Sequence, residues 1–577
     1  MKCLLLVILS VVLLKQQSRA ENWLFKEGKS LYDIVLPRDA SKTEQTAASE
    51  FQQIISNISG VRLPICLEDS MKQGKHVYIG FCNATAINLN VQRPASNEET
   101  YCYQTKDDNL FIYGGSNRGT MYGVFSFLER ELGVHWYTSS YTKIPKMRKF
   151  LLRPLRRHEK PAIHQRLEFY YDALRHDEWA AHNLLNTQYS LSDTKYGSMT
   201  AYWGIHTFEI LLPPSVYFKN HPEFFSVYNG KRSDKAQLCL SNHAMRLELT
   251  KNLKETIDKN PGYWCYDVSQ NDNQNPCECT DCMRLVKRYG GHSGAMLWFV
   301  NQVAHDIKKI HPYIFVGTFA YQYTRQAPTS NIQPADNVVI RLCDIECCMG
   351  HSLETCEMNS SFMNDLKKWR RIAKNIYIWD YTTGFSNYLL PFPNFDVLAV
   401  NYRLFDRSEV IGVMEEGAHN APWNEFSELK QWMIAKLLWN PYQDTDSLAR
   451  LFIKDYYGKA SHYVWKYYQL CKNQVKPNSH FSVTIDWQSE IYGDKFISNS
   501  LALMNKAQKA IEKDKVLTER INRLRAQLLY LKLRRNPALS AIDGTLNTFK
   551  EIVKADETLI RENNYKLDDL LKDLKYY

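Results

Sequence analysis

Short apolar runs alternate with stretches of helical periodicity from about residue 161 to residue 440. Apolar or β-branched runs between polar loops are typical of buried parallel strands, and apolar spacings of three and four are typical of helices. We expect strands near residues 163–170, 184–190, 224–228, 262–269, 314–320, 337–343, 375–380 and 410–414. We expect helices within residues 242–259, 294–310, 361–373 and 426–438. Eight strands with intervening helices predict an α/β fold, a (β/α)8 TIM-type barrel.

The chain before this region has a pattern of its own and predicts an N-terminal α/β domain. The segments YDIVLP, HVYIGF and NLFIYGG are typical of strands. Two amphipathic stretches are expected to form helices that end at Gly60 and Gly133, because glycine adopts the left-handed conformation of a helix cap without strain. This order predicts a small sheet with helices on one face.

Changes in pattern set the expected domain boundaries. The basic and polar stretch 151–160 has the composition of a linker, so we assign residues 21–155 to the N-terminal domain and 156–440 to the barrel. Strand patterns end after that, and helical periodicity marks the tracts 496–513, 516–534 and 546–554. Residues 441–577 are therefore expected to form a helical C-terminal region without a catalytic signature.

The first twenty residues have the features of a signal peptide. Lys2 precedes the apolar run LLLVILSVVLL, and a polar patch ends at Ser18, Arg19 and Ala20. The run is too short for a membrane-spanning helix, and no later stretch is long and apolar enough for one. We expect cleavage after Ala20 and a secreted or periplasmic protein.

Composition narrows the class of ligand. Hydrophobic residues make up 44% and charged residues 23% of the chain, which is ordinary for globular proteins. Aromatic residues reach 13%, and aromatic faces stack on the apolar faces of sugars. The net charge is +10, and the lysine and arginine residues are scattered along the chain. No block of basic residues is interleaved with aromatic residues, so a nucleic-acid partner is not predicted. A glycan or glycoprotein fits this composition better.

Cys277, Cys279 and Cys282 form a CxCxxC cluster. A zinc site is one interpretation, with Cys265 or a more distant residue as the fourth ligand. A local disulfide with one buried thiol is the other. The cysteines number fourteen including Cys3 of the predicted leader, so the mature chain keeps an odd number and at least one thiol outside a disulfide.

The segment NVVIRLCDIECC carries the strongest candidate chemistry. It has the pattern of a buried strand that runs into a loop, and Asp344 and Glu346 are two residues apart in it. Side chains at this spacing point to the same side of a strand, so the two carboxyl groups are expected to project together. Such a pair suits a protonated general acid beside an ionised partner. A solvated acidic turn is the alternative. Cys343, Cys347 and Cys348 beside the pair are expected to be buried apolar fillers.

Polar residues also stand at the ends of other expected strands. They are candidates for substrate binding because the chemistry of such barrels lies where strands end. Each has a structural alternative: an ion pair for Asp380, a natural turn for the NDN sequence, a satisfied structural role for the histidine. Of the adjacent Glu415 and Glu416, which point opposite ways on a strand, Glu415 is favoured for the cleft. The candidates are His206, Asn271, Asp272, Trp379, Asp380 and Glu415.

Several long motifs between about residues 200 and 440 resemble a known family. They are HPEFFSVYNGKR with QLCLSN, VSQNDNQNPCECTDC, VIRLCDIECC, IWDYTTGFSNYLLPFPN and GVMEEGAHNAPWNEFSELKQWMIAKLLWNP. These stretches resemble the exported bacterial proteins of the domain of unknown function 4838 family. That family includes the endo-β-N-acetylglucosaminidases of glycoside hydrolase family 163, which act on complex N-glycans. The N-terminal domain likewise resembles the α/β domain that precedes the barrels of hexosaminidases and α-glucuronidases.

The resemblance implies retaining hydrolysis assisted by the acetamido group of the substrate. In that mechanism Asp344 orients the acetamido nitrogen, and Glu346 protonates the leaving oxygen and later activates water. No cofactor is implied, and we expect no metal to be needed for the chemistry.

Other interpretations remain open. The catalytic pair could be Glu346 with Asp380 or Glu415, set across the cleft. A glycan-binding protein without turnover would keep the same aromatic residues. An α-glucuronidase would need a cation for the carboxylate of its sugar, and the candidates are Arg166, Arg325 and Arg341. The sequence leaves the oligomeric state open.

Overall fold

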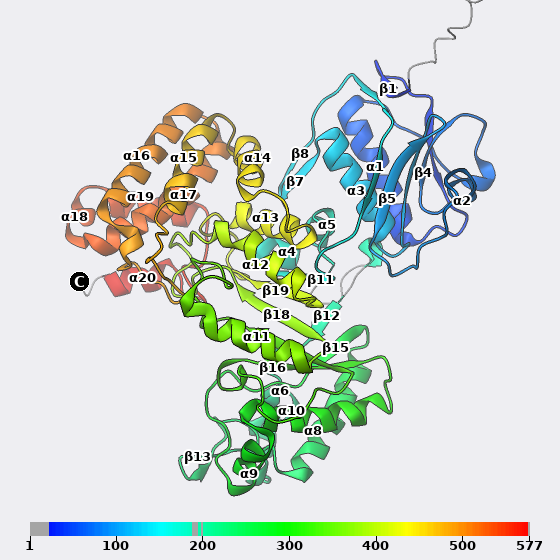
Figure 1. Ribbon diagram of the computed structural model, residues 1–577. Coiled ribbons are helices and arrows are strands. Elements are labelled where there is room, and N and C mark those ends of the chain that lie inside the picture. The colour runs from blue at the N-terminus through cyan, green and yellow to red at the C-terminus, as the bar shows by residue number, and fades with distance from the viewer. Residues whose placement is uncertain (1–21, 187–193, 198–199, 575–577) are drawn as a thin grey trace, which may run out of the picture. The chain divides into compact units, whose positions relative to one another are not determined.

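The computed structural model describes residues 22–186, 194–197 and 200–574 (Figure 1). The described chain forms two compact units. The first comprises residues up to 135 together with 142–160 and 194–197, and the second comprises 136–141, 161–186 and 200–574. The predicted leader lies outside the described residues. No helix within the described residues has the length and apolarity that crossing a membrane requires.

The first unit is built on a six-stranded mixed sheet. Its strands, in sheet order, are β10 (Arg156–Glu159), β5 (Tyr101–Lys106), β6 (Asn109–Gly114), β4 (Lys75–Ile79), β2 (Tyr32–Leu36) and β3 (Ile65–Leu67). Helices α1 (Lys42–Ser59) and α3 (Gly119–Leu132) pack together against one face. Helix α2 (Asn83–Leu89) belongs to a smaller apolar cluster on the other face, so helices cover both faces rather than the predicted one.

The two long helices of this unit end as predicted. Helix α1 begins with a capping box, in which the Ser41 hydroxyl accepts from the Glu44 backbone N–H and the Glu44 carboxylate accepts from the Ser41 N–H. Gly60 closes it at φ 77°, and Gly133 closes α3 at φ 70°. Both glycines adopt the left-handed conformation that other residues reach only with strain, which confirms the expected caps.

The second unit contains a parallel sheet of seven strands. In sheet order they are β11 (Gln165–Phe169), β19 (Gly412–Glu416), β18 (Ile376–Tyr381), β17 (Val338–Cys343), β16 (Phe315–Ala320), β15 (Tyr263–Asp267) and β12 (Thr200–Trp203). Six of the eight predicted strands are confirmed. The strand predicted at 184–190 lies largely outside the described residues. The prediction at 224–228 is wrong, because only Val227–Tyr228 is extended there, in a hairpin with Lys231–Arg232.

The seven-stranded sheet is strongly curved. The rings of Tyr202 and Tyr377 lie 5.2 Å apart although their strands, β12 and β18, are separated by three others in the sheet. Gly412 makes room for this crowded interior, since a Cβ there would lie 2.4 Å from the Tyr377 ring. Arg341 fills the same interior, with its guanidinium 3.6 Å from the Tyr202 ring centroid. Within the described residues β11 and β12 are the two ends of the sheet, so closure into a complete barrel is not confirmed.

Helices connect most of these strands, as the periodicity predicts. The main connections are α8 (His243–Lys259), α9 (Thr280–Tyr289), α10 (His292–Lys308), α11 (Ser360–Ile372), α12 (Phe395–Arg407) and, after the last strand, α13 (Ser427–Trp439). The four predicted helical tracts correspond to α8, α10, α11 and α13 and are confirmed.

The end of the chain is helical, also as predicted. Its helices are α14 (Thr445–Tyr457), α15 (Ser461–Lys472), α16 (Asp494–Ile511), α17 (Lys515–Arg535), α18 (Pro537–Ile542), α19 (Thr545–Ala555) and α20 (Leu567–Leu574). The three predicted tracts correspond to α16, α17 and α19. These helices share one continuous apolar core with the curved sheet.

Candidate active site

A cleft of about 410 Å³ opens where the parallel strands end. This is where α/β sheets place their ligands, because the loops that follow the strands meet there. Aromatic side chains make up much of its wall: Phe169, Phe319, Tyr321, Trp379, Tyr381 and Phe385. Its ionisable side chains other than those of cysteine and tyrosine are His206, Asp272, Glu416, His419 and Glu562. Flat aromatic faces with a few carboxyl groups are suited to binding a sugar ring.

The structure separates the carboxyl groups of Asp344 and Glu346. The strand ends at Cys343, and the chain then turns, with the Cys347 N–H donating to the Asp344 carbonyl at 2.8 Å. Cys343 and Ile345 line the cleft, so Asp344, between them, points the other way and is fully buried. Glu346 is exposed and pairs with Arg325 at 2.7 Å. The expectation that the two groups project together is wrong, because strand alternation does not continue through the turn.

Asp380 and Glu415 also face away from the cleft. Their neighbours Trp379, Tyr381 and Glu416 line it, and side chains alternate along a strand. Asp380 pairs in register with Glu415, and Glu415 pairs with Glu168 on β11.

Together with Asp344, these residues form a row of four buried carboxyl groups on the convex side of the sheet, which we call the carboxyl row. Burial raises the pKa of Asp344, Glu168 and Glu415 well above the ordinary range, and a neighbouring carboxylate raises each of them further. Burial raises the pKa of Asp380 to about 6. Asp344, Glu168 and Glu415 therefore tend to hold protons at neutral pH, whereas Asp380 ionises near pH 6.

Of the six predicted binding residues, three reach the cleft, whereas Asn271, like Asp380 and Glu415, does not. His206, Asp272 and Trp379 line it, and the Asp272 carboxylate accepts a hydrogen bond from the Tyr321 hydroxyl at 3.0 Å. The Asn271 side chain instead accepts from the Glu209 N–H and donates to a backbone carbonyl, as expected for a turn.

Glu416 has the properties of a proton donor. Burial, with further contributions from the charges of Glu562 and Asp272, raises its pKa to about 8. The indole N–H of Trp379 donates to its carboxylate at 2.6 Å and partly opposes that rise. A group with this pKa is largely protonated at neutral pH, which suits a general acid. The sequence favours Glu415 for the cleft, whereas Glu416 lines it together with Trp379 of the neighbouring strand. The alternation of side chains relative to Trp379 is the signal in the sequence that points to Glu416.

The hydrogen bond from Trp379 leads to a prediction about pH dependence. Trp379→Phe keeps an aromatic face but removes the N–H that stabilises the charged form of Glu416, so the Glu416 pKa rises further. The basic limb of the kcat profile is expected to move to higher pH. Trp423→Phe is the control, because the Trp423 N–H donates to the Asp556 carbonyl instead. A limb that stays in place or moves down would show that Glu416 is not the titrating acid.

One set of cleft residues has metal-binding potential. Ligand atoms of Glu416, His419 and Glu562 lie within 4.8 Å of one another. Catalysis without a metal, the expectation from the sequence, stays a prediction.

The side chains of four cysteines lie close together in the part of the chain between β12 and β16. Cys239 joins Cys277, Cys279 and Cys282, whereas Cys265 lies buried in the sheet and is not part of the group. The Cys239 sulfur is 3.7 Å from that of Cys279 and 3.8 Å from that of Cys282. A tetrahedron with Zn–S bonds of about 2.3 Å has edges of about 3.8 Å. The geometry fits the zinc interpretation with Cys239 as the fourth ligand.

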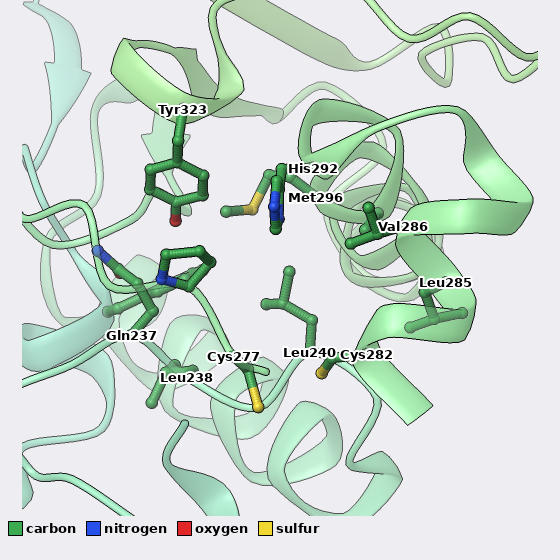
Figure 2. Close-up of a pocket in the computed structure, with 13 residues that line it drawn as sticks. Gln237, Leu238, Leu240, Cys277, Cys282, Leu285, Val286, His292, Met296 and Tyr323 are labelled. Atoms are coloured by element: carbon green, nitrogen blue, oxygen red, sulfur yellow. The ribbon is translucent and has the colours of Figure 1, made fainter. Parts of the chain in front are cut away.

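Figure 2 shows the small apolar cavity beside these cysteines, with the sulfur atoms of Cys277 and Cys282 at one edge. Its volume is about 20 Å³, which is close to the space for a single water molecule. A sugar does not fit there, so the cleft at the strand ends remains the candidate for substrate.

The three candidate arginines lie outside the cleft lining. Arg166 donates to the backbone carbonyls of Ile163, His164 and Leu184. Arg325 pairs with Glu346 and Asp365, and Arg341 lies in the interior of the curved sheet. Among the residues that the structure describes, no arginine or lysine lines the cleft.

The family model named "Domain of unknown function (DUF4838)" matches residues 136–469, more than half of the chain. The chain belongs to this family. The model of the glycosyl hydrolase family 67 N-terminus matches residues 21–127, in agreement with the resemblance of the N-terminal domain to domains that precede glycosidase barrels. The narrower resemblance to glycoside hydrolase family 163 stays a prediction. No curated protein matches the sequence.

Solved structures resemble the chain in fold. A family GH115 4-O-methyl-α-glucuronidase with specificity for decorated arabinogalactans has a TM-score of 0.57 at 10% identity, over 91% of this chain and 76% of that one. The chitobiase of Flavobacterium johnsoniae has a TM-score of 0.46 at 12% identity, over 96% of each chain. The likeness to the GH115 enzyme shows that the fold of this DUF4838 chain is similar to the fold of a glycosidase.

Proposed function

We propose that the protein is a glycoside hydrolase whose substrate binds in the cleft at the strand ends. The observation that carries the proposal is Glu416, a half-buried carboxyl group in the cleft wall whose pKa is raised to about 8, beside the aromatic faces of the cleft. The family 67 N-terminal module and the fold likeness to a GH115 enzyme support the same class of activity.

The charge of the cleft favours a neutral sugar over an acidic one. Asp272, Glu416 and Glu562 all line it, and within the described chain no arginine or lysine does so. A uronic acid would bring a further carboxylate into a site that already holds carboxyl groups, at an electrostatic cost. The α-glucuronidase interpretation is therefore less favoured. We propose the activity implied by the sequence motifs, an endo-β-N-acetylglucosaminidase that releases complex N-glycans.

The cleft suggests roles for its own residues. Glu416 protonates the leaving oxygen and then, ionised, deprotonates the incoming water. Asp272, oriented by Tyr321, is placed to stabilise the positive charge that develops on the sugar or on its acetamido group. The assignment of these roles to Glu346 and Asp344 remains the competing proposal, and their variants belong in the same assay. Export with loss of the leader after Ala20 also stays a proposal.

A screen of released products tests the function. The purified protein is incubated with N-glycoproteins and, separately, with a polysaccharide that contains uronic acids. The released products are identified by mass spectrometry, and their initial anomeric configuration is followed by proton NMR. Release of N-glycans that keep a single reducing N-acetylglucosamine in the β configuration is expected. Uronic acid release alone would support the glucuronidase instead. Binding of glycans without any turnover would identify a glycan-binding protein.

A further inference from the structure

A second group of cysteines and histidines lies near the cleft, apart from the four-cysteine group. Cys348, His351 and Cys356 come from the loop after β17, and His480 comes from the segment between α15 and α16. One ligand atom of each lies within 4.8 Å of the others. His480 is 124 positions from Cys356 in the sequence, so only the fold brings this fourth ligand to the other three.

The distances match a tetrahedral metal site. The Cys348 sulfur lies 3.3 Å from His351 Nδ1 and 3.4 Å from His480 Nδ1, and the Cys356 sulfur lies 3.6 Å from His480 Nδ1. Zn–S bonds of about 2.3 Å and Zn–N bonds of about 2.05 Å give a sulfur–nitrogen edge of about 3.5 Å. Every one of the three measured edges is close to that value.

Neighbouring groups fix the orientation of the ligands. His351 Nε2 lies 3.0 Å from the Lys476 carbonyl, which only an N–H can satisfy, so Nδ1 is left with the lone pair that a metal needs. Asn359 accepts the Cys348 N–H at 2.7 Å and donates to the carbonyl of the same residue at 3.1 Å. The loop is thus held in the ligating conformation by hydrogen bonds outside the group.

The two segments also fit each other next to this group. The Met349 N–H donates to the Phe481 carbonyl at 2.8 Å, and Gly350 leaves room for the Phe481 ring, which would lie 2.5 Å from a Cβ. The segment continues into Val483 and Thr484, which line the cleft. An interaction that holds His480 against the loop after β17 therefore also positions one wall of the cleft.

We propose that Cys348, His351, Cys356 and His480 bind one zinc ion that fastens the segment around residues 476–484 to the loop after β17. Two thiolates and two imidazoles are a ligand set that zinc prefers, and four protein ligands leave no open position, so the ion is structural. Cys348 is then a ligand rather than the buried filler that the sequence predicts. Binding of zinc at these four residues does not require that the protein be a glycosidase.

Zinc content per chain is the direct test. The protein is prepared with zinc present, dialysed, and analysed by elemental mass spectrometry. His480→Ala and Cys348→Ser are each expected to contain one zinc ion fewer than the wild type. Cys282→Ser is expected to lose the zinc ion of the four-cysteine group instead. The double variant with His480→Ala and Cys282→Ser is therefore expected to lose both ions. The matched controls are His221→Ala, an exposed histidine paired with Glu223, and Cys66→Ser in the N-terminal unit. Both controls are expected to keep the full content.

A measurement on the wild type covers the case in which a variant does not fold. Cys348 and Cys356 are expected to resist alkylation until a chelator is added, and Co²⁺ is expected to replace zinc with the absorption bands of tetrahedral thiolate ligation. Limited proteolysis should then cut near residues 476–484 faster after chelation. Equal zinc in the wild type and in folded His480→Ala would overturn the proposal. A Cys348–Cys356 disulfide, found by peptide mapping of the non-reduced protein, would overturn it as well.

Discussion

Glu416→Gln is expected to lower turnover of a natural glycan by about 10²–10⁴-fold, the usual contribution of a general acid. The amide cannot protonate the leaving oxygen, but it preserves the size of the side chain and an oxygen that can accept the Trp379 N–H. The loss should be much smaller for an aryl glycoside, whose leaving group departs without a proton. Rates on both substrates, measured with the same enzyme preparation, check this.

Glu415→Gln is the matched control for this experiment. Glu415 is the adjacent residue with the same functional group, but it lies in the carboxyl row on the opposite side of the strand. It is expected to keep most of the activity. Glu346→Gln and Asp344→Asn complete the series. If Glu346→Gln removed turnover while Glu416→Gln left it intact, the acid would lie after β17, as the sequence first indicated.

Asp380→Asn is expected to stabilise the protein at alkaline pH and to change little at acidic pH. The folded protein holds the Asp380 proton up to about pH 6, whereas the unfolded chain releases it near the ordinary value of 3.8. Between these values the folded state binds more protons, so the free energy of unfolding falls as pH rises and levels off above the folded pKa. Because the pKa is raised in the folded state, the ionised Asp380 lowers the stability of the wild type at pH 8, on the order of 1 kcal/mol or more at about 1.4 kcal/mol per pKa unit.

Urea unfolding of the wild type and the variant at about pH 4 and about pH 8 measures this difference. The asparagine keeps an oxygen for the Tyr381 N–H, so the local backbone is preserved. Asp234→Asn, at an exposed position, is the control and should be neutral at both pH values. If Asp380→Asn lowered the free energy of unfolding at both pH values, the Asp380 carboxylate would make a contact that stabilises the protein by more than the burial of its charge costs.

The periodicity of the chain predicted most of the architecture because each element buries its own apolar side chains. Six strands of the curved sheet and the long helices around it were predicted from runs and spacings that need no distant partner. The strand at 200–203 was missed because its sequence, TAYW, is short and has no flanking signal. The apolar run near residue 224 predicts a strand that is not formed, because periodicity alone does not distinguish a short strand from buried apolar loop residues.

The candidate site shows the same limit at the level of single residues. The sequence indicated that acidic and aromatic residues gather where strands end, and His206, Asp272 and Trp379 do line the cleft. It could not give the face of the sheet, and a shift of one residue moves a side chain from the cleft to the convex side. The sequence therefore favours Asp380 and Glu415 for the cleft, whereas the structure places Glu416 there.

The α/β class, the helical C-terminal region, the family motifs and the CxCxxC cluster follow from the amino-acid sequence alone, because each depends on residues that are close together along the chain. Which carboxyl groups face the cleft depends on the tertiary structure. Side chains alternate between the two faces of a strand, and only the curvature of the sheet determines which face lines the cleft. The tertiary structure also brought Glu562 to Glu416, Cys239 to its three partners and His480 to the loop after β17. Those pairings join residues that are tens to more than a hundred positions apart, and no local pattern encodes them.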